Sequence, residues 1–150
     1  SFEHVLARHK RLISAGAASV HRDRFQKAPQ TFLPRIAELI QEGLTVSSEE
    51  VALLHQQQEL TREEILKSME GFDALLCPAT IGAAPDASTT GDTSFNAPWS
   101  FTGLPVVSFR IGSSKEGLPL CIQLVGRPDG EASLLRTAAW LERRVADQAS

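Results

Sequence analysis

The sequence predicts a mixed α/β fold in which helices pack on a β-sheet. Two observations carry this prediction. Residues 1–71 contain apolar side chains that recur every three or four positions, which is typical of amphipathic helices. Farther along, two apolar runs share one frame, Gly-Leu-Pro followed by six residues and a Gly, at residues 103–112 and 117–126. Both runs are rich in Val, Ile, Leu and Phe, so each is expected to be a strand.

The first helix is expected to run from Phe2 to about Gln26. Apolar residues from Phe2 to Val20 fall on one helical face. Gly16 weakens this helix by about 1 kcal/mol relative to Ala. Pro29 should end it, because the residue before a proline disfavours helical backbone angles.

Two further helices are expected before residue 72. Thr31 is placed to cap the second helix, and Gly43 fits its C-terminal end. Ser47 and Glu50 have the spacing of a capping box, in which each side chain binds a free backbone N–H of the first turn. This third helix is expected to end at Gly71.

Strands, a loop and a last helix are expected in the remainder. Asp73 to Cys77 is a short apolar strand. Residues 79–94 form a long polar loop, a feature that in compact domains is usually functional or mobile. The two framed strands follow, joined by a turn at residues 112–117, and Asp129 is expected to cap the last helix. The whole chain is interpreted as one segment, with helical residues 1–71, strand and loop residues 72–126, and a terminal helix over 129–147.

The predicted sheet is narrow. Only three strands are expected, and unpaired sheet edges invite association with other strands. We therefore expect the chain either to sit against another part of the same fold or to self-associate.

Composition and charge exclude several classes of function. The 150 residues are 42% apolar and 22% charged, with a net charge of -3. Nonspecific nucleic-acid binding needs a basic surface, so no nucleic-acid partner is expected. No apolar run approaches the roughly 20 residues of a membrane span, and no secretory signal pattern opens the sequence. We expect a cytoplasmic protein without a membrane partner and, because the sequence does not begin with Met, a segment of a longer protein.

The cysteines and histidines suggest no metal or thiol chemistry. Cys77 and Cys121 each lie in an expected strand, where a reduced, buried thiol is the ordinary role. The four histidines have no ligand spacing with either cysteine. Neither a metal site nor cysteine–histidine catalysis is predicted.

Three motifs follow one another in the second half of the chain. They are Phe72-Asp73-Ala74-Leu75-Leu76-Cys77-Pro78-Ala79, then Pro98-Trp99 with Thr102-Gly103-Leu104-Pro105, then Gly117-Leu118-Pro119 with Gln123 and Gly126. In order and spacing they resemble the last third of the amidase signature family, which includes bacterial amidases and the A subunit of glutamyl-tRNA amidotransferase. The resemblance implies the C-terminal part of that fold, with helices packed on a larger mixed β-sheet whose other strands lie elsewhere.

The same resemblance implies an activity, but not one that this chain performs alone. The family hydrolyses or transfers carboxamides through an acyl-Ser intermediate, using two serines and a lysine in a Gly/Ser-rich signature. This sequence has no such run; residues 112–114, Gly-Ser-Ser, are interpreted as a turn. We therefore expect no catalytic residue in this chain, no activity from the chain alone, and no cofactor. The alternative is a non-catalytic binding or scaffold remnant of the fold.

Three residues are candidates for binding a small amide substrate. In the family, the region around residues 81–101 borders the acyl-substrate pocket. Asp92 and Asn96 are short polar groups suited to hydrogen-bond an amide or amine, and Trp99 suits an apolar wall. The structural alternatives stay open: Asp92 caps a turn, Asn96 caps the segment to Phe101, and Trp99 is a core residue.

Overall fold

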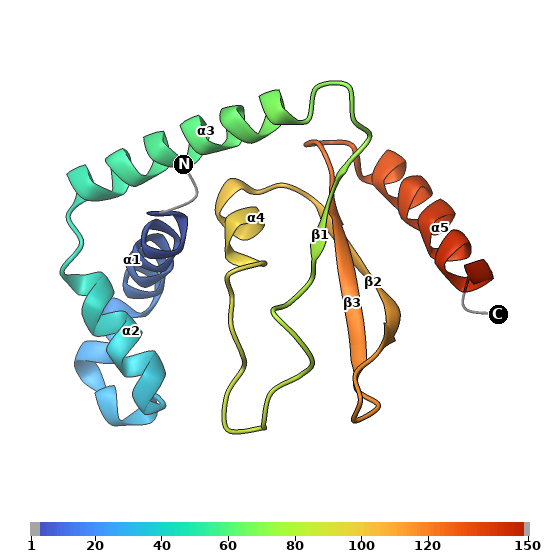
Figure 1. Cartoon of the computed structure of the whole chain (residues 1–150). Helices are drawn as coiled ribbons and strands as arrows, with labels where there is room; N and C mark the ends of the chain where they lie inside the picture. Colours follow the sequence, from blue (N-terminus) through green and yellow to red (C-terminus); the bar gives the residue numbers. More distant parts are fainter. Residues whose placement is uncertain (1–3, 149–150) are drawn as a thin grey trace. The chain divides into compact units, whose positions relative to one another are not determined.

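The structure, a computed structural model, describes residues 4–148 and has a mixed α/β architecture (Figure 1). Its elements in order are α1 (Val5–Lys27), η2 (Pro29–Thr31), α2 (Pro34–Leu44), α3 (Ser48–Ser68), β1 (Leu75–Pro78), α4 (Ala97–Thr102), β2 (Val106–Ser113), β3 (Pro119–Val125) and α5 (Glu131–Gln148). The predicted fold class is confirmed. The chain divides into two compact units, the first ending at Thr61 and the second beginning at Arg62. No helix in the described part of the chain has the length and apolar character needed to cross a membrane.

The first unit is built on α1 packed against α2. Val5, Ala18 and Phe25 of α1 and Ile40 of α2 are buried there. The predicted long first helix is confirmed from Val5 onward, whereas Phe2 lies outside the described residues. Burial of these apolar side chains, rather than helix propensity, is what stabilises two such helices.

Two capping predictions in this unit have different outcomes. Thr31 does not cap α2: its hydroxyl donates to the Ala28 carbonyl at 2.8 Å within η2, and α2 begins three residues later. The short hydroxyl satisfies a local acceptor first, as Thr commonly does. Ser47 does cap α3, because its Oγ accepts the Glu50 N–H at 3.1 Å.

The second unit contains the three-stranded sheet. The strand order is β1-β3-β2, and both pairs are antiparallel. Gln123 in the central strand stands opposite Cys77 of β1 and Ser108 of β2. A register shift interrupts the β2–β3 pair between Arg110 and Gly112. Both framed strands are confirmed, and the larger mixed sheet stays an expectation, because the described strands are all antiparallel.

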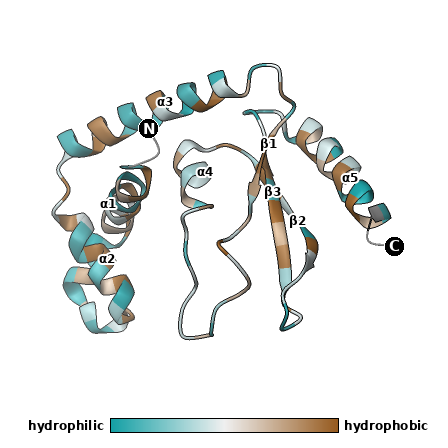
Figure 2. Cartoon of the chain, in the orientation of Figure 1, coloured by the Kyte–Doolittle hydropathy of each residue, from teal (hydrophilic) through white to brown (hydrophobic). Residues whose placement is uncertain are grey.

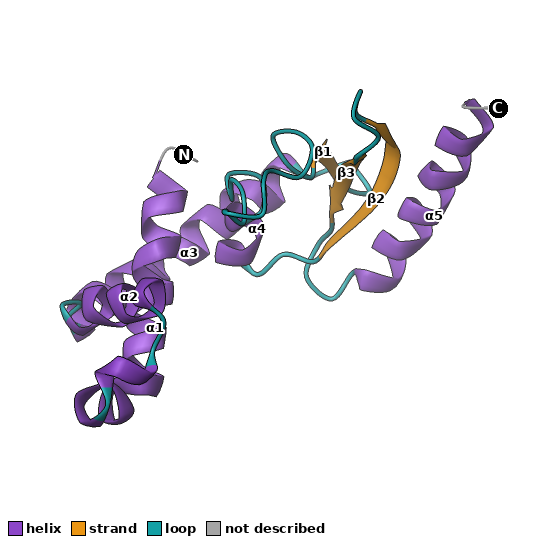
Figure 3. Ribbon diagram, turned by 90° about the horizontal axis from the view of Figure 1, so that it is seen from below, coloured by secondary structure: helices purple, strands orange, loops and turns teal. Residues whose placement is uncertain are grey.

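Apolar residues cover both faces of this sheet. On one face α5 packs on β2 and β3, where Leu134 and Ala138 meet Leu124 (Figure 3). On the other face the buried cluster consists of Ile65, Met69, Trp99, Leu104 and Val125. The apolar colouring of β1 and β3 in Figure 2 follows from this two-sided burial. Strands covered on both faces are expected to be apolar throughout, as these largely are.

The start of α5 differs from the prediction. The sequence predicts a cap at Asp129, but Leu134 donates its N–H to the Gly130 carbonyl and α5 begins at Glu131. Asp129 instead occupies a left-handed turn conformation with φ 57°. Asp is one of the few residues that tolerate this conformation, so it serves the turn rather than the cap.

Candidate functional site

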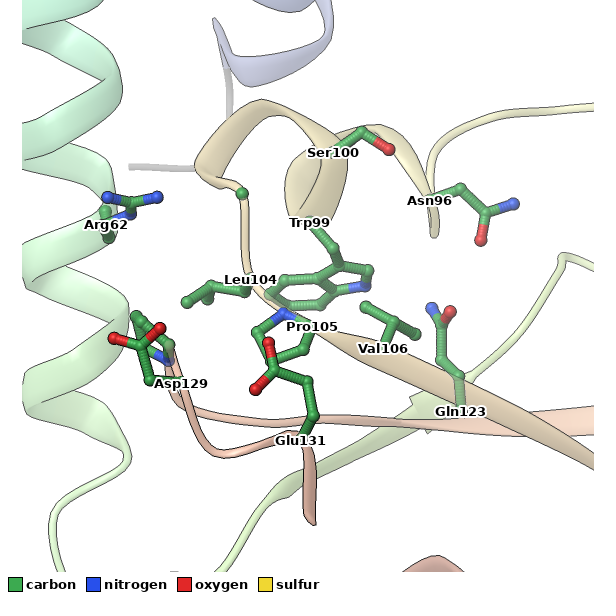
Figure 4. Close-up of a pocket in the computed structure, with 12 residues that line it drawn as sticks. Arg62, Asn96, Trp99, Ser100, Leu104, Pro105, Val106, Gln123, Asp129 and Glu131 are labelled. Atoms are coloured by element: carbon green, nitrogen blue, oxygen red, sulfur yellow. The ribbon is translucent and has the colours of Figure 1, made fainter. Parts of the chain in front are cut away.

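A cavity of about 670 Å³ opens in the second unit (Figure 4). It lies where α4 meets the sheet, and α3 and the start of α5 contribute to its walls. The lining residues are Arg62, Asn96, Trp99, Ser100, Gly103, Leu104, Pro105, Val106, Gln123, Pro128, Asp129 and Glu131. The sequence motif Pro98-Trp99 to Gly103-Leu104-Pro105 therefore forms much of this site.

The short helix α4 is fixed at both ends by its own sequence. Pro98 occupies the first turn, where its missing N–H is not needed. Gly103 ends the helix in a left-handed conformation with φ 65°, which a glycine adopts without steric cost. A β-carbon on Gly103 would lie 2.8 Å from Arg62 Nη2. Arg62 in turn donates its Nε–H to the Thr102 carbonyl at 2.7 Å, holding the C-terminal end of α4.

Trp99 belongs both to the core and to the cavity. It is 9% exposed and packs in the cluster with Met69, Leu104 and Val125. The same side chain lines the cavity, and Figure 4 shows its indole lying above Pro105 and between Leu104 and Val106. The two roles proposed for Trp99 are therefore compatible. A rigid buried aromatic makes a well-defined apolar wall.

Asn96 lines the same cavity from the loop before α4. It is exposed, and its side chain makes no capping hydrogen bond to α4, although it stands at the N-cap position. The backbone makes the bonds at the helix entry: the Asn96 N–H donates to Thr93 O at 2.9 Å, and its carbonyl accepts from Ser100. Its carboxamide is thus left facing the cavity side of the loop, with one donor group and one acceptor available.

Asp92 is placed differently from the other two candidates. It is exposed in the loop and is not among the residues that line the cavity. Its Oδ1 accepts the Ser94 N–H at 2.7 Å, which is the turn-capping alternative for this residue. The Ser94 hydroxyl and then its N–H lower the pKa of Asp92 by hydrogen bonding to the charged form. A substrate-binding role for Asp92 stays a prediction.

Four polar residues of the cavity are absent from the candidates that the sequence suggests: Arg62, Gln123, Asp129 and Glu131. Figure 4 shows Arg62 and Asp129 together at one end, and Gln123 at the other end on the side of Asn96. Gln123 had a signal, because a lone amide in an apolar strand is costly to bury without partners. Arg62 had none, because its bond to Thr102 joins positions 40 residues apart.

A smaller cavity of about 320 Å³ lies under the loop. Its lining residues are Ala79, Thr80, Gly82, Ala84, Asn96, Ser108, Pro119, Cys121 and Gln123. Most of these side chains are small, so the loop approaches the sheet closely. Asn96 and Gln123 line both cavities and form the boundary between them.

The Gly-Ser-Ser tripeptide is part of the β2–β3 hairpin, as predicted. The Ser114 Oγ accepts the N–H groups of Glu116 and Leu118, at 3.2 and 3.3 Å. Gly117 completes the turn with φ 82°. These bonds are those of a turn-forming serine, and the tripeptide is not among the residues lining either cavity.

Comparison with known proteins decides the family. The family model described as "Amidase" matches residues 1–135. The chain belongs to the amidase family. Over 93 residues it is 38% identical to the fatty acid amide hydrolase of Medicago truncatula, covering 53% of this chain and 15% of that protein. Over 82 residues it is 42% identical to the A subunit of the glutamyl-tRNA(Gln) amidotransferase of Ruegeria pomeroyi, covering 49% of this chain and 16% of that protein.

A solved structure supports the same assignment. A crystal structure described as that of an amidase superimposes with a TM-score of 0.87 at 27% identity, covering 95% of this chain and 36% of the other. The amidase-family chain therefore spans about a third of that solved protein. It spans about a sixth of the length of the two curated relatives in matched residues.

Proposed function

We propose that this chain supplies one wall of the substrate pocket of an amidase-type enzyme that hydrolyses or transfers a carboxamide. The observation that carries the proposal is the cavity of about 670 Å³ lined by Asn96 and Trp99, in a chain of the amidase family. The acyl-Ser chemistry is part of the proposal, with the nucleophilic Ser, the relay Ser and the Lys outside this chain. A serine hydroxyl needs such a base, because it is a weak nucleophile by itself.

The cavity residues fit a small amide in three respects. The carboxamide of Asn96 offers a donor and an acceptor, which is the complement of a substrate carboxamide. Trp99 and Leu104 offer apolar surface for an acyl chain. Arg62, Asp129 and Glu131 place charges of both signs at the cavity, where they orient polar substituents of a substrate. Asp92, farther along the loop, is proposed to contact substrate only from the loop side.

The partner in this proposal is the remaining part of an amidase fold. Within the described residues, β1 and β2 each pair with β3 on one side only. Such edges favour added strands, and the chain covers only 36% of the solved amidase it resembles. Self-association of the isolated chain is the alternative occupant of the same edges. One relative is named as part of a multisubunit amidotransferase, which agrees with a fold that works in assemblies.

The proposal is tested on the intact protein with a panel of simple primary and secondary carboxamides. We expect release of ammonia or amine above the buffer rate. A serine-directed fluorophosphonate should abolish this turnover, and peptide mapping should place the label outside residues 4–148. Labelling of Ser113 or Ser114, or turnover that survives complete labelling, would contradict the proposal.

The second candidate function is a non-catalytic binding or scaffold protein derived from the amidase fold. It is favoured by the absence of a Gly/Ser-rich signature from this sequence. The same panel separates the two. A remnant would bind carboxamides in calorimetry, or bind none, and would neither release product nor react with the fluorophosphonate.

A further inference from the structure

Gln123 is a polar residue at the most buried place in the sheet. It lies in the central strand β3, and its side chain is 2% exposed. Burying an amide without hydrogen bonds is costly, so its partners decide why it is tolerated there. Its Nε2 donates to the backbone carbonyl of Phe95 at 2.6 Å and to that of Pro78 at 3.1 Å.

These two carbonyls lie at opposite ends of the 79–94 loop. Pro78 is the last residue of β1, and Phe95 directly precedes Asn96. The bonds within the loop are local, such as Ser88 N–H to Asp86 and Ser94 N–H to Asp92. Most of the loop is exposed and buries little apolar surface. One buried amide therefore ties both ends of a long polar loop to the same strand.

The position of Asn96 depends on this tie. Asn96 follows Phe95 directly, and both Asn96 and Gln123 line the larger and the smaller cavity. Figure 4 shows the Gln123 side chain rising from β3 on the side of the cavity where Asn96 lies. Releasing the Phe95 carbonyl would allow Asn96 and the boundary between the cavities to move.

We propose that Gln123 is a positioning residue for substrate: its amide clamps both ends of the 79–94 loop to β3 and so fixes Asn96 at the boundary between the two cavities. This inference rests on the proposed function, because it assigns a role within the same pocket. Gln123 acts through the loop and not on the reacting atoms. Its loss should therefore weaken substrate binding more than the chemical step.

Two variants separate the clamp from simple packing. Gln123→Met keeps the length of the side chain but removes the donor. Gln123→Glu keeps the shape, and its carboxyl donates a hydrogen bond only when protonated. Burial raises the pKa of a carboxyl group, so Gln123→Glu should restore part of the clamp in mildly acidic buffer and lose it at higher pH. A packing role would show no such pH dependence.

The direct readout is hydrogen exchange in the intact protein. The Ala79 N–H donates to Cys121 O at 3.1 Å and reports on one end of the loop, while the Asn96 N–H reports on the other. After correction for intrinsic rates, we expect both amides to exchange roughly tenfold faster or more in Gln123→Met, from the loss of two buried hydrogen bonds. Gln123→Glu should match Gln123→Met above neutral pH and approach the wild type in acid. Ser108→Ala is the matched control, because Ser108 stands opposite Gln123 and lines the smaller cavity without holding the loop.

Kinetics give the second readout. We expect Gln123→Met to raise KM for a carboxamide several-fold with kcat within about twofold of the wild type, consistent with loss of uniform substrate binding. Wild-type exchange at Ala79 and Asn96 in Gln123→Met would overturn the clamp. Faster exchange with an unchanged KM would overturn its role in positioning substrate. If the wild-type protein turns over no amide, the proposed function fails, whereas the exchange rates still decide whether Gln123 clamps the loop.

Discussion

Gly43 of α2 lies directly against the backbone of Ser14 in α1. A β-carbon at Gly43 would stand 1.8 Å from the Ser14 carbonyl oxygen and 2.8 Å from the β-carbon of Ala18. No real contact is that short, so the two helices approach this closely only because residue 43 has no side chain. The glycine expected near the end of α2 thus serves helix packing, and it does not adopt the left-handed conformation of a glycine cap.

Gly43→Ala should therefore destabilise the first unit. We expect a loss of about 1–3 kcal/mol in the free energy of unfolding, because the helices must separate to admit a methyl group. Gly16→Ala is the matched control in α1, where a β-carbon would meet nothing within 4 Å. That change should stabilise by about 0.5–1 kcal/mol through helix propensity. Urea denaturation of both variants checks the pair, and equal effects of the same sign would show that the packing argument is wrong.

The pair Arg11–Glu50 should make stability depend on pH. Arg11 Nε and Nη2 donate to the two carboxylate oxygens of Glu50, at 2.8 and 2.9 Å. The hydrogen bond from Arg11 is the main cause that lowers the pKa of Glu50. The unfolded chain, with a Glu pKa of about 4.3, then binds a proton in a pH range where the folded chain does not. The contribution is thus complete above that value and is lost as pH falls through the lowered pKa.

The measurement is Tm as a function of pH for the wild type and Glu50→Gln. We expect the difference in Tm to shrink as pH falls below about 4.3, and to shrink also at high salt, because the pair is partly exposed. Arg11→Met combined with Glu50→Gln serves as the control, since Glu50→Gln should then have little effect. Parallel Tm curves for wild type and Glu50→Gln across the acid range would contradict this account.

The elements of the second unit are largely predictable because each has a local signal. The glycines of the two Gly-Leu-Pro frames bracket β2 and β3 closely, and the Phe72-Asp73 motif places β1 within two residues of its observed start. The polar loop lacks apolar periodicity, which also is a local property. The cap predicted at Asp129 is wrong, because the sequence does not reveal that this residue takes a left-handed turn.

The site is less predictable than the fold, because its geometry depends on distant partners. Asn96 and Trp99 lie in the motif that forms the cavity, so local sequence finds them. Gln123 holds carbonyls 28 and 45 residues away, and Arg62 holds one 40 residues away. Such pairs depend on how the sheet registers and where α3 passes, which spacing along the chain does not encode.

The isolated chain should have no amidase activity. Its serine pair at residues 113–114 is engaged in a hairpin turn, and no candidate nucleophile lines the larger cavity except Ser100, which has no described base beside it in the lining. We expect the purified 150-residue chain to release no ammonia from simple carboxamides above background. Activity that Ser113→Ala or Ser100→Ala abolishes would show that the nucleophile lies in this chain after all.

Trp99 should be required mainly for stability. Trp99→Ala removes a large side chain from a cluster that includes Met69 and Val125. We expect a loss of roughly 3–5 kcal/mol in the free energy of unfolding. Trp99→Phe should recover much of the stability, and calorimetric Tm values for the two variants provide the check. An unchanged Tm in Trp99→Ala would mean that the indole is not part of the core.

The most direct test of the pocket is the effect of Asn96→Ala on the intact protein, measured as kcat/KM together with Tm. Asn96 is exposed and makes no capping hydrogen bond, so Tm should stay within the error of measurement. Loss of one neutral hydrogen bond to substrate should lower kcat/KM by roughly 2- to 13-fold, which corresponds to about 0.5–1.5 kcal/mol. Asp92→Ala is measured in parallel, with the same expectation of a larger effect on turnover than on stability. Wild-type kcat/KM per folded molecule in Asn96→Ala, or a fall in Tm that accounts for all lost activity, would contradict the assignment of this cavity as the substrate pocket.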